Sequence, residues 1–197
     1  MIFGLFVESF QRPRDPTSFL QPRPSTAFPH ETFLMSLDPA SSQLLRSLLL
    51  NRRVATLATL HEGRPAASMI PFAIARSTDR IRLVTHVSRL AAHTRQMLES
   101  PEVCLLIMAP EDAALPQALP RVSIPAVAEF IPLDHPDFGT LKGAYLTRHP
   151  QAADFFQLGD FSIVALTPLS ARFVAGFGSA HTLKPEALAA VVGDGIV

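Results

Sequence analysis

The chain has 197 residues, of which 48% are hydrophobic and 17% charged, a composition typical of a globular protein with a sizeable core. Its 17 basic and 17 acidic residues cancel, so no global field would attract nucleic acid or an anionic membrane, and neither is expected as a partner. Cys104 is the only cysteine, which excludes an intramolecular disulfide and a zinc site built from cysteines.

Residues 1–36 are expected to form a flexible leader outside the folded domain. This segment contains serine, threonine and arginine and five prolines, a composition that disfavours packed structure. The prolines are Pro13, Pro16, Pro22, Pro24 and Pro29. The first ten residues are apolar but lack a basic region and are interrupted by Glu8, which argues against a secretory signal. No apolar run approaches the length of a membrane span, and a cytoplasmic location is the simplest expectation.

Residues 37–185 are expected to form one domain, which opens with a helix. Asp38 followed by Pro39 is typical of an N-cap and first helical position, and the helix should end near Asn51. Its apolar face should comprise Leu44, Leu45, Leu48 and Leu49. Residues 53–60 and 66–74 then read as two strands of a hairpin joined by the turn 61–65, with Pro71 favouring a sheet edge or a bulge.

The central stretch, residues 80–108, reads as strand, polar turn, helix and buried strand. Residues 80–85 alternate polar and apolar side chains, as in a half-buried strand. Ser88 is placed as the N-cap of a helix that Pro101 closes. The apolar positions of this helix should be Leu90, Thr94, Met97 and Leu98. Residues 103–108 are apolar throughout, and we expect a strand that is apolar on both faces.

The start of this helix could hold a phosphate monoester. A helix N-terminus offers backbone N–H groups without internal partners and about half a positive charge. Ser88 would add a hydroxyl and Arg89 a fork of donors, while Arg89, His93 and Gln96 recur at the spacing of one helix face. The alternative is that Ser88 only caps the helix and Arg89 is solvated.

Beyond residue 110 the pattern predicts more strands and two more helices. Residues 121–131 read as a strand broken at Pro125, and 134–149 as a helix. Residues 161–166 and 171–177 read as a closing hairpin around Pro168. A short helix is expected from Pro185, although residues 186–197 are assigned to a C-terminal tail. The fold class is therefore mainly β with helices: an antiparallel barrel of six or seven strands with helices at its rim.

The run HVSRLAAHTRQMLESPEVCLLI, residues 86–107, resembles the flavin mononucleotide (FMN)-binding split-barrel family of pyridoxamine 5′-phosphate oxidase. It is most similar to the branch related to haem-utilisation proteins, which has a Ser-x-Leu-Ala-x-His-Thr turn. Three further stretches resemble the same branch in the same order: 55–74, 143–163 and 173–181. The resemblance covers about residues 40–185 and implies an FMN-binding split β-barrel.

The resemblance also implies a homodimer with FMN near the subunit interface. The positions that match the cofactor-contacting segments of the family are Ser68, Thr85, Ser88, Arg89, His93 and Thr94. The chain departs from the branch at Gln96, where asparagine is common, and at Ser179, where arginine is common. Many members continue into a second, smaller domain; this sequence stops at Val197, so that domain is absent or the chain is a fragment. Because haem ligands in such proteins tend to lie in or beyond that domain, haem is less expected here than FMN.

Three functions follow from the residues and the resemblance. The first is an FMN-dependent oxidoreductase, whose chemistry the cofactor would supply; no catalytic residue or physiological substrate is identified. The second is a haem-binding or haem-degrading protein, and the third a non-catalytic dimeric binding module. The chain has no Walker, HExxH or GxSxG motif, and its histidines lack metal-ligand spacing, so no metal site is expected. His86 is interpreted as a polar residue at a strand end, with a role near the flavin ring as the alternative.

Overall fold

A computed structural model describes residues 37–76, 80–111 and 115–193. The leader expected at residues 1–36 lies outside these ranges. The helices are α1 (Pro39–Asn51), α2 (Ala92–Glu99), α3 (Phe138–Arg148) and α4 (Pro185–Val192), with short 3₁₀ segments η2 (Pro116–Ala118) and η3 (Pro150–Gln157). The strands are β1 (Val54–His61), β2 (Arg64–Pro71), β3 (Ala73–Arg76), β4 (Ile81–Ser88), β5 (Glu102–Met108), β6 (Arg121–Ile131), β7 (Phe161–Pro168), β8 (Ala171–Gly176) and β9 (Ser179–Leu183).

These strands form one antiparallel sheet whose two ends meet at Phe72. The order is β2-β1-β5-β6-β7-β4-β3, and only Phe72 separates β2 from β3 in the chain. The N–H of Phe72 donates to the carbonyl of Arg53 beside β1 (3.1 Å), and the hydroxyl of Thr85 in β4 donates to the carbonyl of Pro71 (2.8 Å). One stretch of chain thus passes from pairing with β1 to pairing with β4, which curls the sheet into the predicted antiparallel barrel.

The predicted helix start and first hairpin are confirmed. Asp38 caps α1, with Oδ1 accepting from the N–H of Ser41 (3.0 Å). Hydrogen bonding with Ser41 lowers the pKa of the Asp38 carboxyl. β1 and β2 pair along their whole length. Glu62 and Gly63 both have positive φ, 51° and 73°, which is the conformation that a two-residue hairpin turn requires.

The predicted hairpin around Pro168 is wrong. β7 pairs with β4 and β6, while β8 pairs with β6 and β9, so β7 and β8 follow one another along the same edge of β6. The break between them faces Pro125, which has no N–H to donate, and the N–H of Leu169 donates to the Pro125 carbonyl (2.8 Å). β6 itself continues through Pro125. The true hairpin is β8–β9, which turns at Gly178 with a φ of 76°.

The described residues therefore contain nine strands where six or seven were expected. The predicted strand 66–74 is divided at Phe72, and β9 was not predicted. The division at Phe72 comes from the closure of the sheet, whereas β9 only extends the sheet beside β8. Alternation within a segment does not identify the strand that the segment pairs with.

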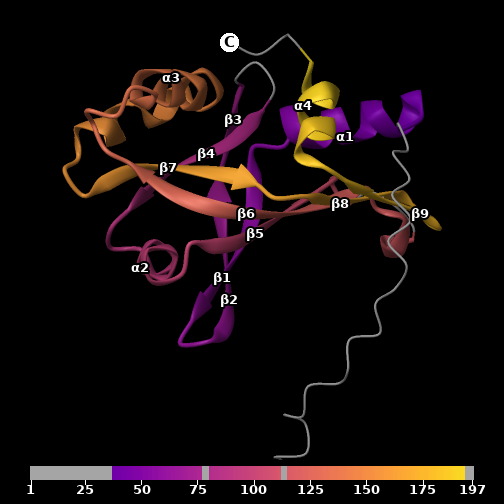
Figure 1. Cartoon of the computed structure of the whole chain (residues 1–197), viewed down its shortest axis with the longest axis horizontal. Helices are drawn as coiled ribbons and strands as arrows, with labels where there is room; N and C mark the ends of the chain where they lie inside the picture. Colours follow the sequence, from indigo (N-terminus) through magenta and orange to yellow (C-terminus); the bar gives the residue numbers. More distant parts are fainter. Residues whose placement is uncertain (1–36, 77–79, 112–114, 194–197) are drawn as a thin grey trace, which may run out of the picture. The chain divides into compact units, whose positions relative to one another are not determined.

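Two apolar clusters stabilise the barrel. The larger one fills the inner face and includes Leu57, Leu105 and Phe173, closed at one side by α1 and α4, which lie next to each other in Figure 1. The second lies on the outer face, where Leu141 and Tyr145 of α3 pack on β3, β4 and β7. The described part of the expected tail, residues 186–193, contains most of α4, whose Leu188, Ala189 and Val192 belong to the larger cluster.

Candidate functional site

The turn between β4 and α2 is built differently from the predicted helix start. Ser88 is the last residue of β4, and the N-cap of α2 is Ala91, whose side chain cannot cap. The hydroxyl of Ser88 accepts from the N–H of Leu90 (3.1 Å) and donates to Oδ2 of Asp160 (2.6 Å). The prediction of Ser88 as N-cap is therefore wrong, because pairing with Phe161 of β7 keeps Ser88 in the strand.

Arg89 lies outside α2, so it does not share a helix face with His93 and Gln96 as predicted. Its side chain is exposed, and in the part of the chain that the structure covers its guanidinium makes no hydrogen bond or ion pair. Its backbone N–H donates to the carbonyl of Asp160 (2.7 Å). The turn thus offers an exposed cation and a helix start without a side-chain cap, but the carboxylate of Asp160 lies beside them.

Thr85 and Thr94, two further predicted site residues, are fully buried. The hydroxyl of Thr85 donates to Pro71 at the closure of the barrel (2.8 Å), and that of Thr94 donates to the carbonyl of Ser88 (2.7 Å). Thr94 therefore fastens the first turn of α2 to the end of β4. Leu90 and Leu98, predicted as apolar core positions of this helix, are exposed, whereas Met97 is buried. The helix is shorter than predicted and presents a narrower apolar face.

His93 lies on the flank of α2 and is half-buried. Burial lowers its pKa below the usual value of 6.5, so the neutral imidazole predominates at physiological pH. Its ring nitrogens form no hydrogen bond with any other described residue. The neutral imidazole is the form in which histidine binds a metal centre.

Ser68 lies on β2, on the face of the β1–β2 hairpin that α2 covers. In the hairpin register Ser68 is opposite Leu57 and Thr59 is opposite Ala66, so Ser68 and Thr59 share one face. Thr59 donates to Oε1 of Gln96 in α2 (2.6 Å), and α2 contacts both strands. The hydroxyl of Ser68 is buried without a hydrogen-bond partner, which is uncommon in folded proteins.

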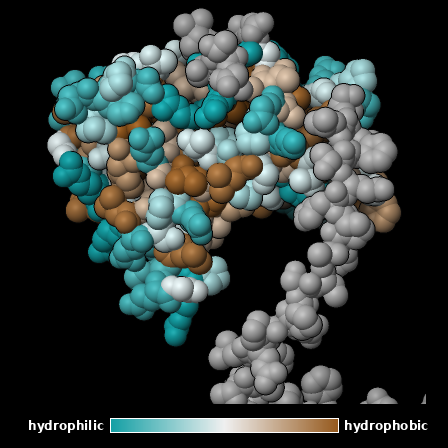
Figure 2. Space-filling model, in the orientation of Figure 1, coloured by the Kyte–Doolittle hydropathy of each residue, from teal (hydrophilic) through white to brown (hydrophobic). Residues whose placement is uncertain are grey.

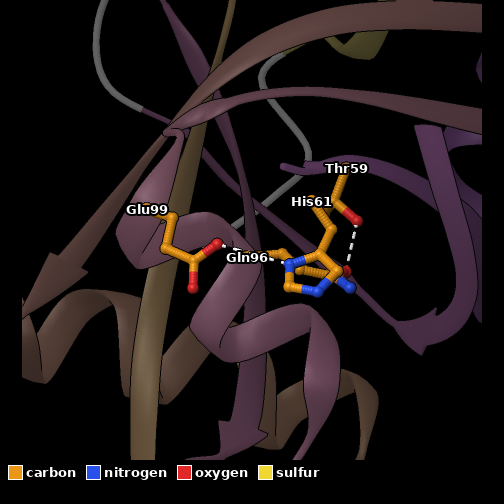
Figure 3. A network of polar contacts seen from close by, with 4 residues as sticks. All are labelled: Thr59, His61, Gln96 and Glu99. Atoms are coloured by element: carbon orange, nitrogen blue, oxygen red, sulfur yellow. Dashed lines mark hydrogen bonds and ion pairs between the residues drawn. The ribbon is translucent and has the colours of Figure 1, made fainter. Parts of the chain in front are cut away.

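Two polar contacts fasten the C-terminal half of α2 to β1 (Figure 3). One is the Thr59–Gln96 hydrogen bond, and the other is an ion pair between His61 Nδ1 and Glu99 Oε2 (3.4 Å). Both partners of this pair are more than half exposed, so it adds little stability. A cleft of about 370 Å³ lies beside these contacts, lined by His61, Ala92, Arg95, Gln96 and Glu99.

Ser88, Arg89, His93 and Thr94 therefore lie at one turn, and Thr85 lies in β4, the strand that leads into this turn. Ser68 lies on a different strand, beneath the helix that follows the turn. Sequence reasoning missed Asp160, which the β4–β7 register places beside Ser88. The chain offers no signal for this contact, since a polar residue just before a strand is commonplace and its partner strand must be known first.

His86 is a second residue whose setting was not predicted. It lies inside β4, is 8% exposed, and stacks on Phe156 with ring centroids 3.8 Å apart. Tyr145 and Phe161 flank the same ring. Burial, with a contribution from Lys142, lowers the pKa of His86 to about 4, and burial raises the pKa of Tyr145 to about 12. His86 is therefore a neutral core residue and not the polar strand-end residue that was expected.

The outer face of β2, β1 and β5 with the adjoining part of β6 carries mainly apolar side chains. We call this surface the β1–β5 face; its outward residues include Leu60, Met69, Cys104, Leu106, Met108 and Val127. Met69 is 64% exposed, and a groove of about 420 Å³ runs past Leu60, Cys104 and Leu169. Burial raises the pKa of the Cys104 thiol, so the unreactive protonated form predominates. Figure 2 shows apolar side chains gathered between polar regions on one face of the molecule.

Two classes of feature are absent from the described residues. Across 37–76, 80–111 and 115–193, no three histidine, cysteine, aspartate or glutamate side chains gather closely enough to hold a metal ion. Within the same ranges, no helix has the length and apolar character needed to cross a bilayer.

A family model described as pyridoxamine 5′-phosphate oxidase matches residues 41–175 of the chain. Among curated proteins, "Non-canonical heme oxygenase HOZ, chloroplastic" from Arabidopsis thaliana is 31% identical over 144 residues. That alignment covers 71% of this chain and 42% of the plant protein, so the chain spans less than half the length of this relative.

Solved structures share the same fold. A heme binding protein from Mycobacterium smegmatis superposes with a TM-score of 0.68 at 30% identity, over 78% of this chain and 62% of that chain. HutZ, the heme storage protein from Vibrio cholerae, superposes with a TM-score of 0.56 at 26% identity, over 68% and 91% of the two chains. The predicted antiparallel split barrel with inserted helices is therefore confirmed.

Proposed function

The chain belongs to the pyridoxamine 5′-phosphate oxidase family, and from that premise we propose that it binds haem through its split barrel. The observation that carries this proposal is the agreement of its relatives. The plant protein is named as a heme oxygenase, the mycobacterial one as heme binding and the Vibrio one as heme storage. The proposal reverses the order expected from sequence, in which FMN came first.

The side chains at the β4–α2 turn suit such a ligand. Haem needs an iron donor and cations for its two carboxylates. His93 is a half-buried, neutral imidazole without a partner among the described residues, and Arg89 is an exposed guanidinium four positions before it. We assign His93 as the candidate iron ligand and Arg89 as a candidate partner for a carboxylate. Bound haem would supply the iron for redox chemistry, and the protein would supply binding and orientation.

A haemin titration of the purified chain tests this proposal. We expect a saturable Soret band at one haem per chain, and we expect His93→Ala to weaken binding at least tenfold. His135→Ala is the matched control, since His135 lies between β6 and α3, outside the turn, and should leave the titration unchanged. Absence of saturable binding would contradict the function, while binding that is unaffected by His93→Ala would contradict the assigned ligand.

FMN binding is a second candidate, which two observations favour. The hydroxyl of Ser68 is buried without a partner, and Ala91 leaves the first amides of α2 uncapped. A flavin could satisfy both groups, and FMN-dependent oxidoreduction would then follow from the cofactor. Against this, the Ser88 hydroxyl already donates to the Asp160 carboxylate. An absorption spectrum distinguishes the three functions, because flavin and haem absorb at different wavelengths. A colourless protein that binds neither ligand would support the non-catalytic binding module.

The chain is further proposed to form a symmetric homodimer through the β1–β5 face. α3 covers the outer face of β3, β4 and β7, but no described helix covers the outer face of β1 and β5. Monomeric proteins rarely leave a contiguous apolar face of this kind in water. In a dimer with a twofold axis, the β1–β5 faces of the two subunits would pack against each other, with β5 near the middle of the interface.

Light scattering at micromolar concentration is expected to give twice the chain mass of 21.4 kDa. Leu106→Glu on the β1–β5 face should give the monomer, because a carboxylate would be buried without a partner at the interface. Leu133→Glu is the control, since Leu133 is 84% exposed and lies outside this face. A monomeric wild-type chain would refute the dimer. If Leu106→Glu fails to fold, Met69→Lys serves instead, at a position that is already exposed.

A further inference from the structure

Asp160 and Ser88 form an interlocked pair at the β4–α2 turn. The Ser88 hydroxyl donates to Oδ2 of Asp160 at 2.6 Å, a short distance typical of an O–H donating to a carboxylate. The backbone N–H of Arg89 donates to the Asp160 carbonyl (2.7 Å), and that of Leu90 donates to the Ser88 hydroxyl (3.1 Å). The first bond holds the carboxylate itself, and the other two hold the backbone of Asp160 and the hydroxyl of Ser88 beside the start of α2.

No cation neutralises this carboxylate within the described part of the chain. Two ion pairs of the described residues, His61 with Glu99 and Arg82 with Asp137, lie on other parts of the barrel and do not include Asp160. Arg89 follows Ser88 directly, but its guanidinium extends into solvent without pairing with Asp160. The turn thus carries a fixed negative charge at the place where a phosphate would need donors.

We propose that Asp160 determines which ligands this turn accepts, by rejecting a phosphate dianion. A hydroxyl has one proton to donate, and that of Ser88 is already given to Asp160. A phosphate seated on Ser88 and the first amides of α2 would lie within a few ångströms of the carboxylate, where like charges repel strongly. An uncharged ligand such as riboflavin escapes this repulsion. The inference concerns the turn of the proposed haem site, but it does not require that haem binds.

Flavin binding to the full chain tests the role of Asp160. Asp160→Asn removes the charge and keeps an oxygen that can accept from Ser88. At about 50 mM salt we expect this variant to bind FMN at least tenfold more tightly than the wild type. Binding of riboflavin, which lacks the phosphate, should not change. The gain should shrink at 1 M salt, because the Debye length falls to about 3 Å.

Asp154→Asn is the matched control. Asp154 lies in η3 of the same connection and is exposed, with no contact to Ser88, so its removal changes the net charge equally and should leave FMN binding unchanged. Ser88→Ala is a second variant; it removes the hydroxyl but keeps the carboxylate, and it should continue to reject FMN. Thermal unfolding verifies that each variant is folded.

Three results would overturn the role assigned to Asp160: equal FMN affinity in the wild type and Asp160→Asn, an equal gain for FMN and riboflavin, or an equal gain in Asp154→Asn. If Asp160→Asn does not fold, FMN binding by Ser88→Ala as tight as that expected for Asp160→Asn would overturn it too. The haemin titration tests the binding of a different ligand and the role of a different residue, His93. Failure of haem binding and failure of this inference are therefore distinguishable.

Discussion

Phe72→Ala is expected to lower the free energy of unfolding by about 3–5 kcal/mol, the range for truncating a fully buried phenylalanine. The side chain is 0% exposed and belongs to the larger apolar cluster, and the guanidinium of Arg148 lies 5.3 Å from its ring centroid. The Phe72 carbonyl also accepts from Nε2 of His149 (2.8 Å). The residue lies where the sheet closes, so a cavity there would loosen packing on both sides.

Urea denaturation provides the measurement, with the midpoint falling and the slope unchanged if the transition stays two-state. Phe177→Ala is the matched control, because Phe177 is 79% exposed at the β8–β9 turn and its truncation should cost less than about 0.5 kcal/mol. Equal losses in the two variants would contradict the assignment of Phe72 to the closure of the barrel.

Lowering the pH from 7 to 4 is expected to destabilise the protein by roughly 3 kcal/mol through His86 alone. The folded state holds the pKa of His86 at about 4, whereas the unfolded value is 6.5. The unfolded chain therefore binds the proton more tightly. The stabilisation is fully present above pH 6.5 and is lost as the pH falls toward 4. The groups that face the ring are Phe156, Tyr145 and Phe161, with Lys142 nearby, and none of them accepts its proton.

His86→Phe keeps an aromatic ring beside Phe156 and removes the titratable group, so most of this acid sensitivity should disappear. His149 remains in the variant and contributes in the same direction, because burial lowers its pKa as well. His61→Phe is the control at an exposed position and should leave the dependence on pH intact. The measurement is the free energy of unfolding at several pH values. If this free energy depends on pH as steeply in His86→Phe as in the wild type, the assignment of a buried neutral imidazole is contradicted.

The family resemblance is correct, but the site residues that it predicted are incomplete. The segment 88–94 resembles the family in residue type, but α2 begins at Ala92 and not at Ser88 as expected. Its electrostatic character, however, depends on Asp160, which is 72 residues away from Ser88 in the sequence. The resemblance identified the segment, but it did not include the carboxylate that changes what the segment can bind.

The sequence by itself determined the local elements. The Asp38–Pro39 helix start, the β1–β2 hairpin and the strand at 103–108 all depend on caps, turns and alternation between residues that are close in the chain. These signals also gave the correct fold class, since short connections favour antiparallel pairing. The family resemblance then placed the segments in a split barrel.

Only the tertiary structure decided which strands pair and therefore which distant side chains meet. It placed β8 along β6 and not against β7, joined the sheet at Phe72, and brought Asp160 to Ser88 and Phe156 to His86. Hydrophobic alternation states which face of a strand is buried but not the identity of its neighbour. The carboxylate beside Ser88 and the burial of His86 depend on the pairing of β4 with β7, so they emerge only when the chain is folded.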